Sequence, residues 1–140
     1  MSLFNVMNIS TSGMAAENVR LNTTASNIAN ANSVSSSYEE TYRARHPVFA
    51  AALDKASAEQ SKGVGVNVLG VVESNKPLNV EYSPHNPMAD ENGYIYKPNV
   101  NIVEEMADMM SASKAYETNV QVADTTKRIF RRVLQLGQSR

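Results

Sequence analysis

Residues 102–136 read IVEEMADMMSASKAYETNVQVADTTKRIFRRVLQL and contain neither glycine nor proline. Mostly apolar side chains recur there every seven residues on two tracks that lie four residues apart. The tracks are Ile102, Met109, Tyr116, Ala123 and Phe130, and Met106, Ser113, Val120, Lys127 and Leu134. This 4-3 spacing is typical of a helix that packs along most of its length. Pro98 precedes the stretch and Gly137 follows it, which are expected start and stop signals.

The predicted helix is long for a chain of 140 residues. A helix of about 36 residues measures about 54 Å at 1.5 Å per residue. A compact domain of this chain length is only about 37 Å across. We therefore expect either an elongated molecule or a helix that neighbouring molecules bury.

The N-terminal segment has a weaker heptad pattern, in which Met7, Met14, Leu21 and Ile28 are seven residues apart and Asn18, Ala25 and Asn32 lie between them. The pattern predicts a helix over residues 12–31, with an N-cap among residues 10–12. Its many asparagine and threonine residues are poor helix formers, so the isolated segment would be marginal. Ordering on assembly fits this composition. An ordinary helical hairpin within one monomer remains the alternative.

The middle of the chain has the composition of short strands and turns. Residues 42–50 and 64–72 carry β-branched side chains with partial alternation, while residues 83–87 and 90–93 are typical turn sequences. We therefore predict an α+β fold with long N- and C-terminal helices that form an elongated coiled-coil layer. The domain boundaries expected are 1–36 for the N-terminal helix segment, 37–98 for a small β-rich insert, and 99–140 for the C-terminal helix that pairs with the first.

The residues that carry chemistry are sparse. The chain has no cysteine, and His46 and His85 are isolated from any second ligand, so no catalytic, cofactor-binding or metal site is expected. Gly63, Gly65 and Gly70 fit neither a phosphate-binding nor a dinucleotide-binding loop, and we interpret them as strand positions where backbones approach closely. These observations argue against an enzyme.

Neither a membrane span nor a signal peptide is expected. No apolar run approaches the roughly 18 residues that a transmembrane helix needs, and the first 20 residues have neither a basic nor an apolar signal region. The net charge of −1 gives no general attraction to nucleic acid.

A basic cluster lies late in the C-terminal helix, at Lys127, Arg128, Arg131 and Arg132. Nucleic-acid or membrane binding is one interpretation. The sequence favours the other, in which these charges complement the helix dipole and form ion pairs with a protein partner, because no aromatic side chains are interleaved with them.

Several stretches resemble bacterial flagellar rod and hook proteins. Residues 21–33 (LNTTASNIANANS) resemble the N-terminal signature of that family, and residues 94–106 and 110–119 resemble its C-terminal signature. Residues 82–93 and 134–138 are similar to the proximal rod members. The motif residues are Ser26, Asn27, Ile28, Ala29, Asn30, Ala31, Asn32, Pro98, Asn99 and Val100.

The resemblance implies a structural subunit of the basal-body rod that polymerises through its terminal helices and transmits torque. Such a subunit would be exported without cleavage by the flagellar type III apparatus and would assemble in the periplasm. Its partners would be other rod proteins and further copies of itself, the export-gate adaptor below and the P ring outside, and it would have no catalytic residues. A helical-hairpin adaptor or chaperone-like module that does not polymerise is the alternative.

The residues expected at the assembly interface come from both heptad patterns. They are Met7, Met14, Leu21, Ala25, Ile28, Ile102, Met106, Met109, Tyr116, Val120, Ala123, Phe130 and Leu134.

Overall fold

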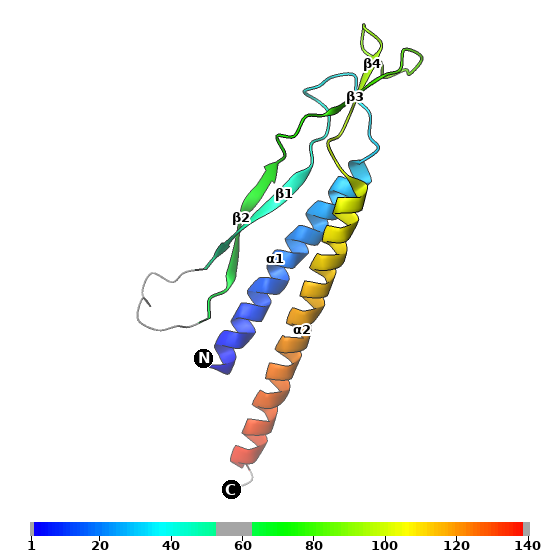
Figure 1. Ribbon diagram of the computed structural model, residues 1–140. Helices are drawn as coiled ribbons and strands as arrows, with labels where there is room; N and C mark the ends of the chain where they lie inside the picture. The colour runs from blue at the N-terminus through cyan, green and yellow to red at the C-terminus, as the bar shows by residue number, and fades with distance from the viewer. Residues whose placement is uncertain (1, 53–62, 139–140) are drawn as a thin grey trace.

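The computed structural model describes residues 2–52 and 63–138. Residues 1, 53–62 and 139–140, which belong to the predicted N-terminal segment, insert and C-terminal segment, lie outside the described residues. Its elements, in chain order, are α1 (Leu3–Asn30), β1 (Arg45–Ala51), β2 (Val66–Glu73), β3 (Asn79–Tyr82), β4 (Tyr94–Lys97) and α2 (Ile102–Gln138). The two helices lie side by side along an elongated molecule, and a small antiparallel β insert connects them (Figure 1). The predicted α+β fold class is confirmed.

Helix α2 has 37 residues and begins where the sequence predicts. Glu104 and Glu105 occupy its first turn, where negative charge is favourable against the helix dipole. The helix ends at Gln138, so the interpretation of Gly137 as a stop signal is wrong, and this glycine lies inside the last turn. At 1.5 Å per residue the helix is about 56 Å long, which explains the elongated shape.

Helix α1 begins at Leu3, nine residues before the predicted start, with Ser2 as its N-cap. The backbone N–H of Asn5 donates to Ser2 Oγ at 3.3 Å. The predicted cap among residues 10–12 is wrong because the hydroxyls of Thr11 and Ser12 donate to carbonyl oxygens within the helix. Thr11 donates to the carbonyl oxygen of Met7 and Ser12 to that of Ile9, both at 2.8 Å, as serine and threonine do inside helices.

Strands β1 and β2 form an antiparallel hairpin that lies along α1 (Figure 1). The register runs from Arg45 opposite Glu73 to Ala51 opposite Val66, with an irregularity between Val48 and Phe49. Both strands fall within two or three residues of their predicted starts.

The glycines of this hairpin differ in their surroundings. A Cβ at Gly65 would lie 2.6 Å from Ser12 Oγ, so the hairpin approaches α1 closely there, as expected. A Cβ on Gly70 would have no atom within 4 Å, so the interpretation of Gly70 as a point of close backbone approach is wrong.

Strands β3 and β4 form a second hairpin that the sequence reasoning missed. Its connection contains both predicted turn segments, and Gly93 adopts a φ of +81°, which favours glycine. Asp90 closes this connection because its Oδ1 accepts from the backbone N–H groups of Tyr94 and Asn92 at 2.8 and 2.9 Å. These bonds hold the pKa of the Asp90 carboxyl below its ordinary value of 3.8, and the bond from Tyr94 has the largest effect.

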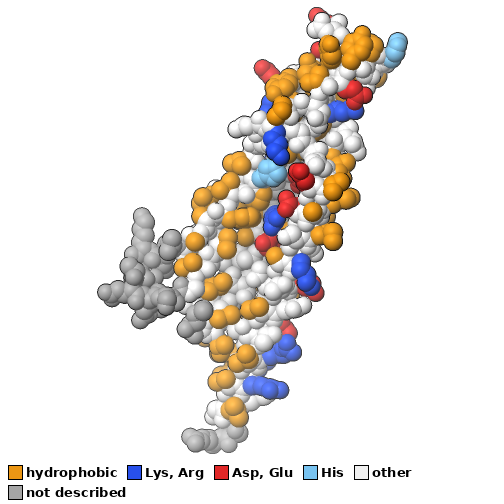
Figure 2. Space-filling view, in the orientation of Figure 1, with side chains coloured by type: hydrophobic (Ala, Val, Ile, Leu, Met, Phe, Trp, Pro, Cys, Tyr) orange, Lys and Arg blue, Asp and Glu red, His pale blue; other side chains and the backbone are white. Residues whose placement is uncertain are grey.

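The hydrophobic core is small. Among the described residues, the buried apolar side chains are Ala16, Ala44, Leu78, Ile95 and Ala112. Most large apolar side chains are exposed instead, and they spread over the length of the molecule (Figure 2). A chain that buries so little apolar surface gains little stability from its own core. No helix in the described part of the chain is both long and apolar enough to cross a membrane.

Candidate assembly interface

The two helices are antiparallel, and three pairs of contacts define their alignment. The rings of Phe4 and Phe130 meet edge to face with centroids 5.4 Å apart. Near the middle, Gly13 faces Asn119, and a Cβ on Gly13 would lie 2.9 Å from Asn119 Nδ2. The two helices therefore approach each other closely at Gly13.

The third pair lies further along α1, where Arg20 donates to Asp108 Oδ1 at 2.7 Å. The Arg20 and Asp108 side chains are 28% and 47% exposed, so solvent screens their attraction. On the same helix, Glu17 Oε2 lies 3.8 Å from Arg20 Nη1. This ion pair fixes the helix alignment more than it stabilises the contact.

The first predicted track of α2 is the more buried of the two. Ile102, Met109, Tyr116 and Ala123 are half-buried, and Phe130 is 37% exposed. The second track, at Met106, Ser113, Val120, Lys127 and Leu134, is exposed along its whole length. Contact of these residues with a neighbouring subunit stays a prediction.

A different set of residues accompanies the first track in the helix contact. Glu105, Ala112 and Thr126 are buried, and Asn119, which recurs at the same seven-residue spacing, is half-buried against Gly13. Sequence reasoning missed this set because three of its four members are polar. The signal was present as a seven-residue spacing three positions from the first track, but a search for apolar periodicity does not detect it.

Helix α1 lies between α2 and the β1–β2 hairpin, and its buried side chains serve both neighbours. They are Ser10, Ala16, Thr23, Thr24 and Asn27. Of the α1 residues expected at the assembly interface, Met14, Leu21 and Ile28 are half-buried, while Met7 and Ala25 are exposed. The intramolecular helix contact is therefore made mainly by small and polar side chains.

Asn27 is completely buried and joins α1 to the start of β1. Its Nδ2 donates to the carbonyl oxygen of Arg45 at 2.8 Å, and its Oδ1 accepts from the backbone N–H of Arg45 at 2.9 Å. The Tyr42 hydroxyl donates to the same Oδ1 at 2.8 Å. Burial raises the pKa of the Tyr42 phenol. The amide thus pairs with the strand edge as a neighbouring peptide group would.

Asn99 has the corresponding position just before α2. Its Oδ1 accepts from the backbone N–H of Ala44 at 2.8 Å, and its Nδ2 donates to the carbonyl oxygens of Lys76 and Ser74 at 2.8 and 3.3 Å. Asn27 and Asn99, the two bridging amides, therefore attach the insert to both helices. Both belong to the expected family motif, and an amide suits these contacts because it donates and accepts hydrogen bonds at the same time.

The other motif residues have varied surroundings. Pro98 is completely buried, and its carbonyl oxygen accepts from Asn79 Nδ2 at 3.0 Å. Ile28, Asn30, Ala31 and Val100 are half-buried, whereas Ser26, Ala29 and Asn32 are exposed. The last three have room for contacts outside the chain.

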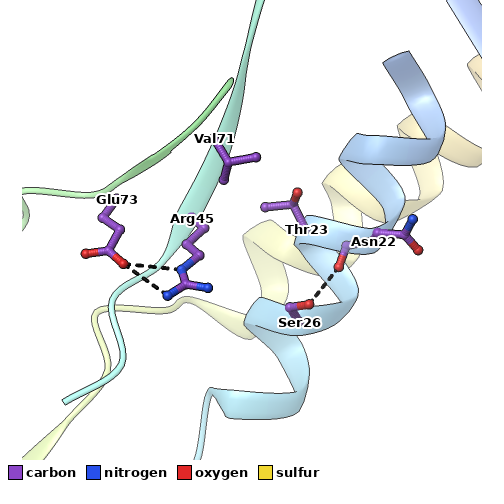
Figure 3. Close-up of a pocket in the computed structure, with 6 residues that line it drawn as sticks. All are labelled: Asn22, Thr23, Ser26, Arg45, Val71 and Glu73. Atoms are coloured by element: carbon purple, nitrogen blue, oxygen red, sulfur yellow. Dashed lines mark hydrogen bonds and ion pairs between the residues drawn. The ribbon is translucent and has the colours of Figure 1, made fainter. Parts of the chain in front are cut away.

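A polar hollow of about 390 Å³ lies between α1 and the β1–β2 hairpin (Figure 3). Its lining residues are Asn22, Thr23, Ser26, Arg45, Val71 and Glu73. Arg45 Nη2 and Glu73 Oε1 pair with each other at 3.1 Å, so the two charged groups of the hollow are bound to each other. At the other end of the hairpin, the backbone N–H of Val66 donates to Ser12 Oγ at 3.1 Å.

Potential metal ligands do not cluster in the described part of the chain. His46 is exposed on β1, and His85 is exposed in the connection between β3 and β4. Across residues 2–52 and 63–138, no group of three or more His, Asp or Glu side chains could hold a metal ion.

Comparison with known proteins shows similarity to flagellar rod proteins over nearly the whole chain. The model of the family described as "Flagella basal body rod protein" matches residues 7–35, and that described as "Flagellar basal body rod FlgEFG protein C-terminal" matches residues 91–136. The flagellar basal-body rod protein FlgC of Salmonella typhimurium is 44% identical over 138 residues, which cover 99% of this chain and 100% of the relative.

Two further relatives carry the same name. The protein of Escherichia coli O6:H1 is 43% identical, with coverage of 99% of this chain and 100% of the relative. That of Aquifex aeolicus is 40% identical, with coverage of 96% and 97%.

Proposed function

The chain belongs to the FlgC family of flagellar basal-body rod proteins and is a structural subunit of the rod, and from this membership we propose that it polymerises through the exposed faces of α1 and α2 to transmit torque. Assembly with other rod proteins follows from the family. The proposal adds which surface makes the contacts and what the assembled helices do.

The outward face of α2 is the observation that carries the proposal. Val103, Met106 and Met110 lie on consecutive turns and are 75%, 53% and 74% exposed. Burying each of these side chains against a neighbour would contribute about 1.5–3 kcal/mol. Methionine suits such contacts because its flexible side chain fits slightly different surroundings in successive neighbours.

The shape of the molecule supports transmission of torque. The helix contact is continuous from Phe4–Phe130 to Arg20–Asp108, so the two helices form one stiff element. Packed side by side in an assembly, such elements would resist twisting. Heterologous contacts between identical subunits build open filaments, which is the form that a rod requires.

The finer features of location and partners belong to the same proposal. We expect uncleaved export by the flagellar type III apparatus, assembly in the periplasm, and contacts with the export-gate adaptor below and the P ring outside. We also expect no enzymatic activity. The family membership supports these expectations. In the described part of the chain, no group of three or more His, Asp or Glu side chains could hold a metal ion.

Substitution of Met110 tests the proposal without touching the helix contact. Met110→Asp places a charge on a 74% exposed position, so the free chain should fold normally while incorporation into basal bodies and motility are lost. Met110→Leu keeps the position apolar and is the matched control. Circular dichroism of the purified variants and protein blots of isolated basal bodies supply the two readouts. A fully motile Met110→Asp strain, or a wild-type chain that remains an unassembled adaptor, would refute the proposal.

A further inference from the structure

All the sulfur in this chain belongs to methionine, because the sequence has seven methionines and no cysteine. Oxidation of sulfur in this protein therefore falls on thioethers alone. A peroxide converts a methionine thioether to a sulfoxide, which turns a flexible apolar side chain into a polar one, and methionine sulfoxide reductases reverse the change. The surroundings of each methionine decide what that change does to the molecule.

The described methionines differ in exposure and in position. Met106 and Met110 are 53% and 74% exposed on α2, and Met88 is 44% exposed in the connection between β3 and β4. The less exposed ones are Met7, Met14 and Met109. A peroxide in solution should therefore reach Met88, Met106 and Met110 most readily.

Met106 and Met110 are about one helical turn apart, so their side chains are neighbours on the surface of α2. We call these two residues the methionine pair. Val103, which is 75% exposed, extends the same apolar face toward the start of the helix. The pair is open to solvent in the free chain, and a neighbouring rod subunit would cover it in the proposed assembly. An oxidant would thus reach the pair before assembly and not after it.

Building on the proposed function, we propose that the methionine pair is an oxidation site that controls entry of the chain into the rod. Hydrogen peroxide transfers one oxygen atom to each sulfur: an S–O bond forms, the O–O bond breaks, and water leaves. The sulfur loses two electrons and the peroxide gains them. In the reverse step, a dithiol reductase releases the oxygen as water while its two thiols become a disulfide.

The sulfoxide oxygen is a hydrogen-bond acceptor, and the surroundings decide its cost. In the free chain this oxygen would be hydrated, so folding should change little. Against the apolar surface of a neighbour it would be buried without a donor, which should weaken the contact about tenfold to a hundredfold. An oxidised chain would therefore fold normally and yet be excluded from the rod.

Met88 provides an internal control within the same chain. Its exposed side chain should oxidise as well, but it lies in the insert, where the backbone N–H of Met88 donates to Asn86 Oδ1 at 2.9 Å. The side chain is not part of the apolar face of α2. A sulfoxide at Met88 should therefore enter the rod freely.

Mass spectrometry of the wild-type chain tests the proposal. In cells without methionine sulfoxide reductases, a second rod protein is withheld while hydrogen peroxide is added and then removed with catalase. Synthesis of this chain is stopped, and expression of the withheld protein then allows rods to assemble from chains oxidised beforehand. We expect the sulfoxide fraction at Met106 and Met110 to be about tenfold lower in isolated basal bodies than in unassembled chain. At Met88 the two fractions should be equal.

Leucine substitutions then test the cause, with each strain compared with its own untreated level of incorporation. Met106→Leu with Met110→Leu removes both thioethers, so peroxide should no longer lower incorporation. Met88→Leu leaves the pair intact and should lose incorporation as the wild type does. Restoring a methionine sulfoxide reductase should return the oxidised wild-type chain to the rod.

Two outcomes would overturn the inference. One is a sulfoxide fraction in basal bodies that is as high at Met106 and Met110 as at Met88, relative to unassembled chain. The other is a double-leucine strain that peroxide impairs as strongly as the wild type. If the double-leucine chain assembles poorly from the start, the measurement on the wild-type chain decides alone. Failure of the proposed function gives a different result, a motile Met110→Asp strain, so the two failures are distinguishable.

Discussion

Replacement of Asn27 by alanine should detach the β1–β2 hairpin from α1. The substitution removes three hydrogen bonds at 2.8–2.9 Å from a side chain with no exposed surface. Each bond contributes about 1 kcal/mol net, and a buried group left without a partner costs somewhat more, so we expect a loss of about 2–4 kcal/mol. That is a large fraction of the stability of a fold with so small a core.

Asn22→Ala is the matched control because the residue lies in the same helix and its exposed side chain bonds only to Asn18 among the described residues. Removing that bond costs little, and alanine favours the helix by about 0.5 kcal/mol, so the control should be neutral or slightly stabilising. Urea unfolding followed by circular dichroism measures the global effect. Amide hydrogen exchange at Arg45 measures the local one, since its N–H donates to Asn27.

The expected pattern is a lower unfolding midpoint and rapid exchange at Arg45 for Asn27→Ala, with neither change for Asn22→Ala. If both variants unfold alike and the Arg45 amide stays protected, Asn27 does not hold the hairpin, and the explanation given for the motif asparagine fails.

Three further predictions concern other parts of the molecule. Gly13→Ala should stabilise the chain less than Gly137→Ala does, because its new Cβ displaces the Asn119 amide, whereas Gly137→Ala meets no atom within 4 Å and should stabilise α2 by up to about 1 kcal/mol; thermal unfolding of both variants measures the difference, and a larger gain for Gly13→Ala would contradict the close approach. Phe130→Asp should abolish rod assembly and motility while Phe130→Leu preserves them, and normal basal bodies from the aspartate variant would contradict the assigned contact. The lowered pKa of Asp90 means that its contribution to stability is complete above pH 3.8 and is lost as the pH falls further; Asp90→Asn should flatten that part of an acid titration, and an unchanged titration would exclude the effect.

The long C-terminal helix could be predicted from the sequence because its signals are local and consistent. Heptad spacing and the absence of Gly and Pro both mark residues 102–136 as one helix. The start of α1 could not be predicted in the same way. Serine and threonine at residues 10–12 have the composition of a cap, but they donate to helical carbonyls, and only the backbone geometry distinguishes the two uses.

The helix contact was harder still to predict. Glu105 and Thr126 are buried on α2 and Asn119 is half-buried against Gly13, although all three side chains are polar. Apolar Met106 and Met110 lie outside. Hydrophobic patterning predicts burial in the final environment of a chain, and for a subunit of an assembly that environment includes its neighbours. The contacts of Asn27 and Asn99 connect residues far apart in the sequence, so no local pattern predicts them.

The two attachments of the β1–β2 hairpin to α1 match the repeat distances of helix and strand. Ser12 and Asn27 are 15 residues apart, which is about 22 Å of helix. From Val66 to Glu73, opposite Arg45, the strand advances seven residues, or about 23 Å. An insertion of two residues in each strand would lengthen the hairpin by roughly 7 Å and require about four more helical residues to keep both bonds. Changes in length during evolution should therefore avoid these segments, or alter helix and strand in a ratio near two to one.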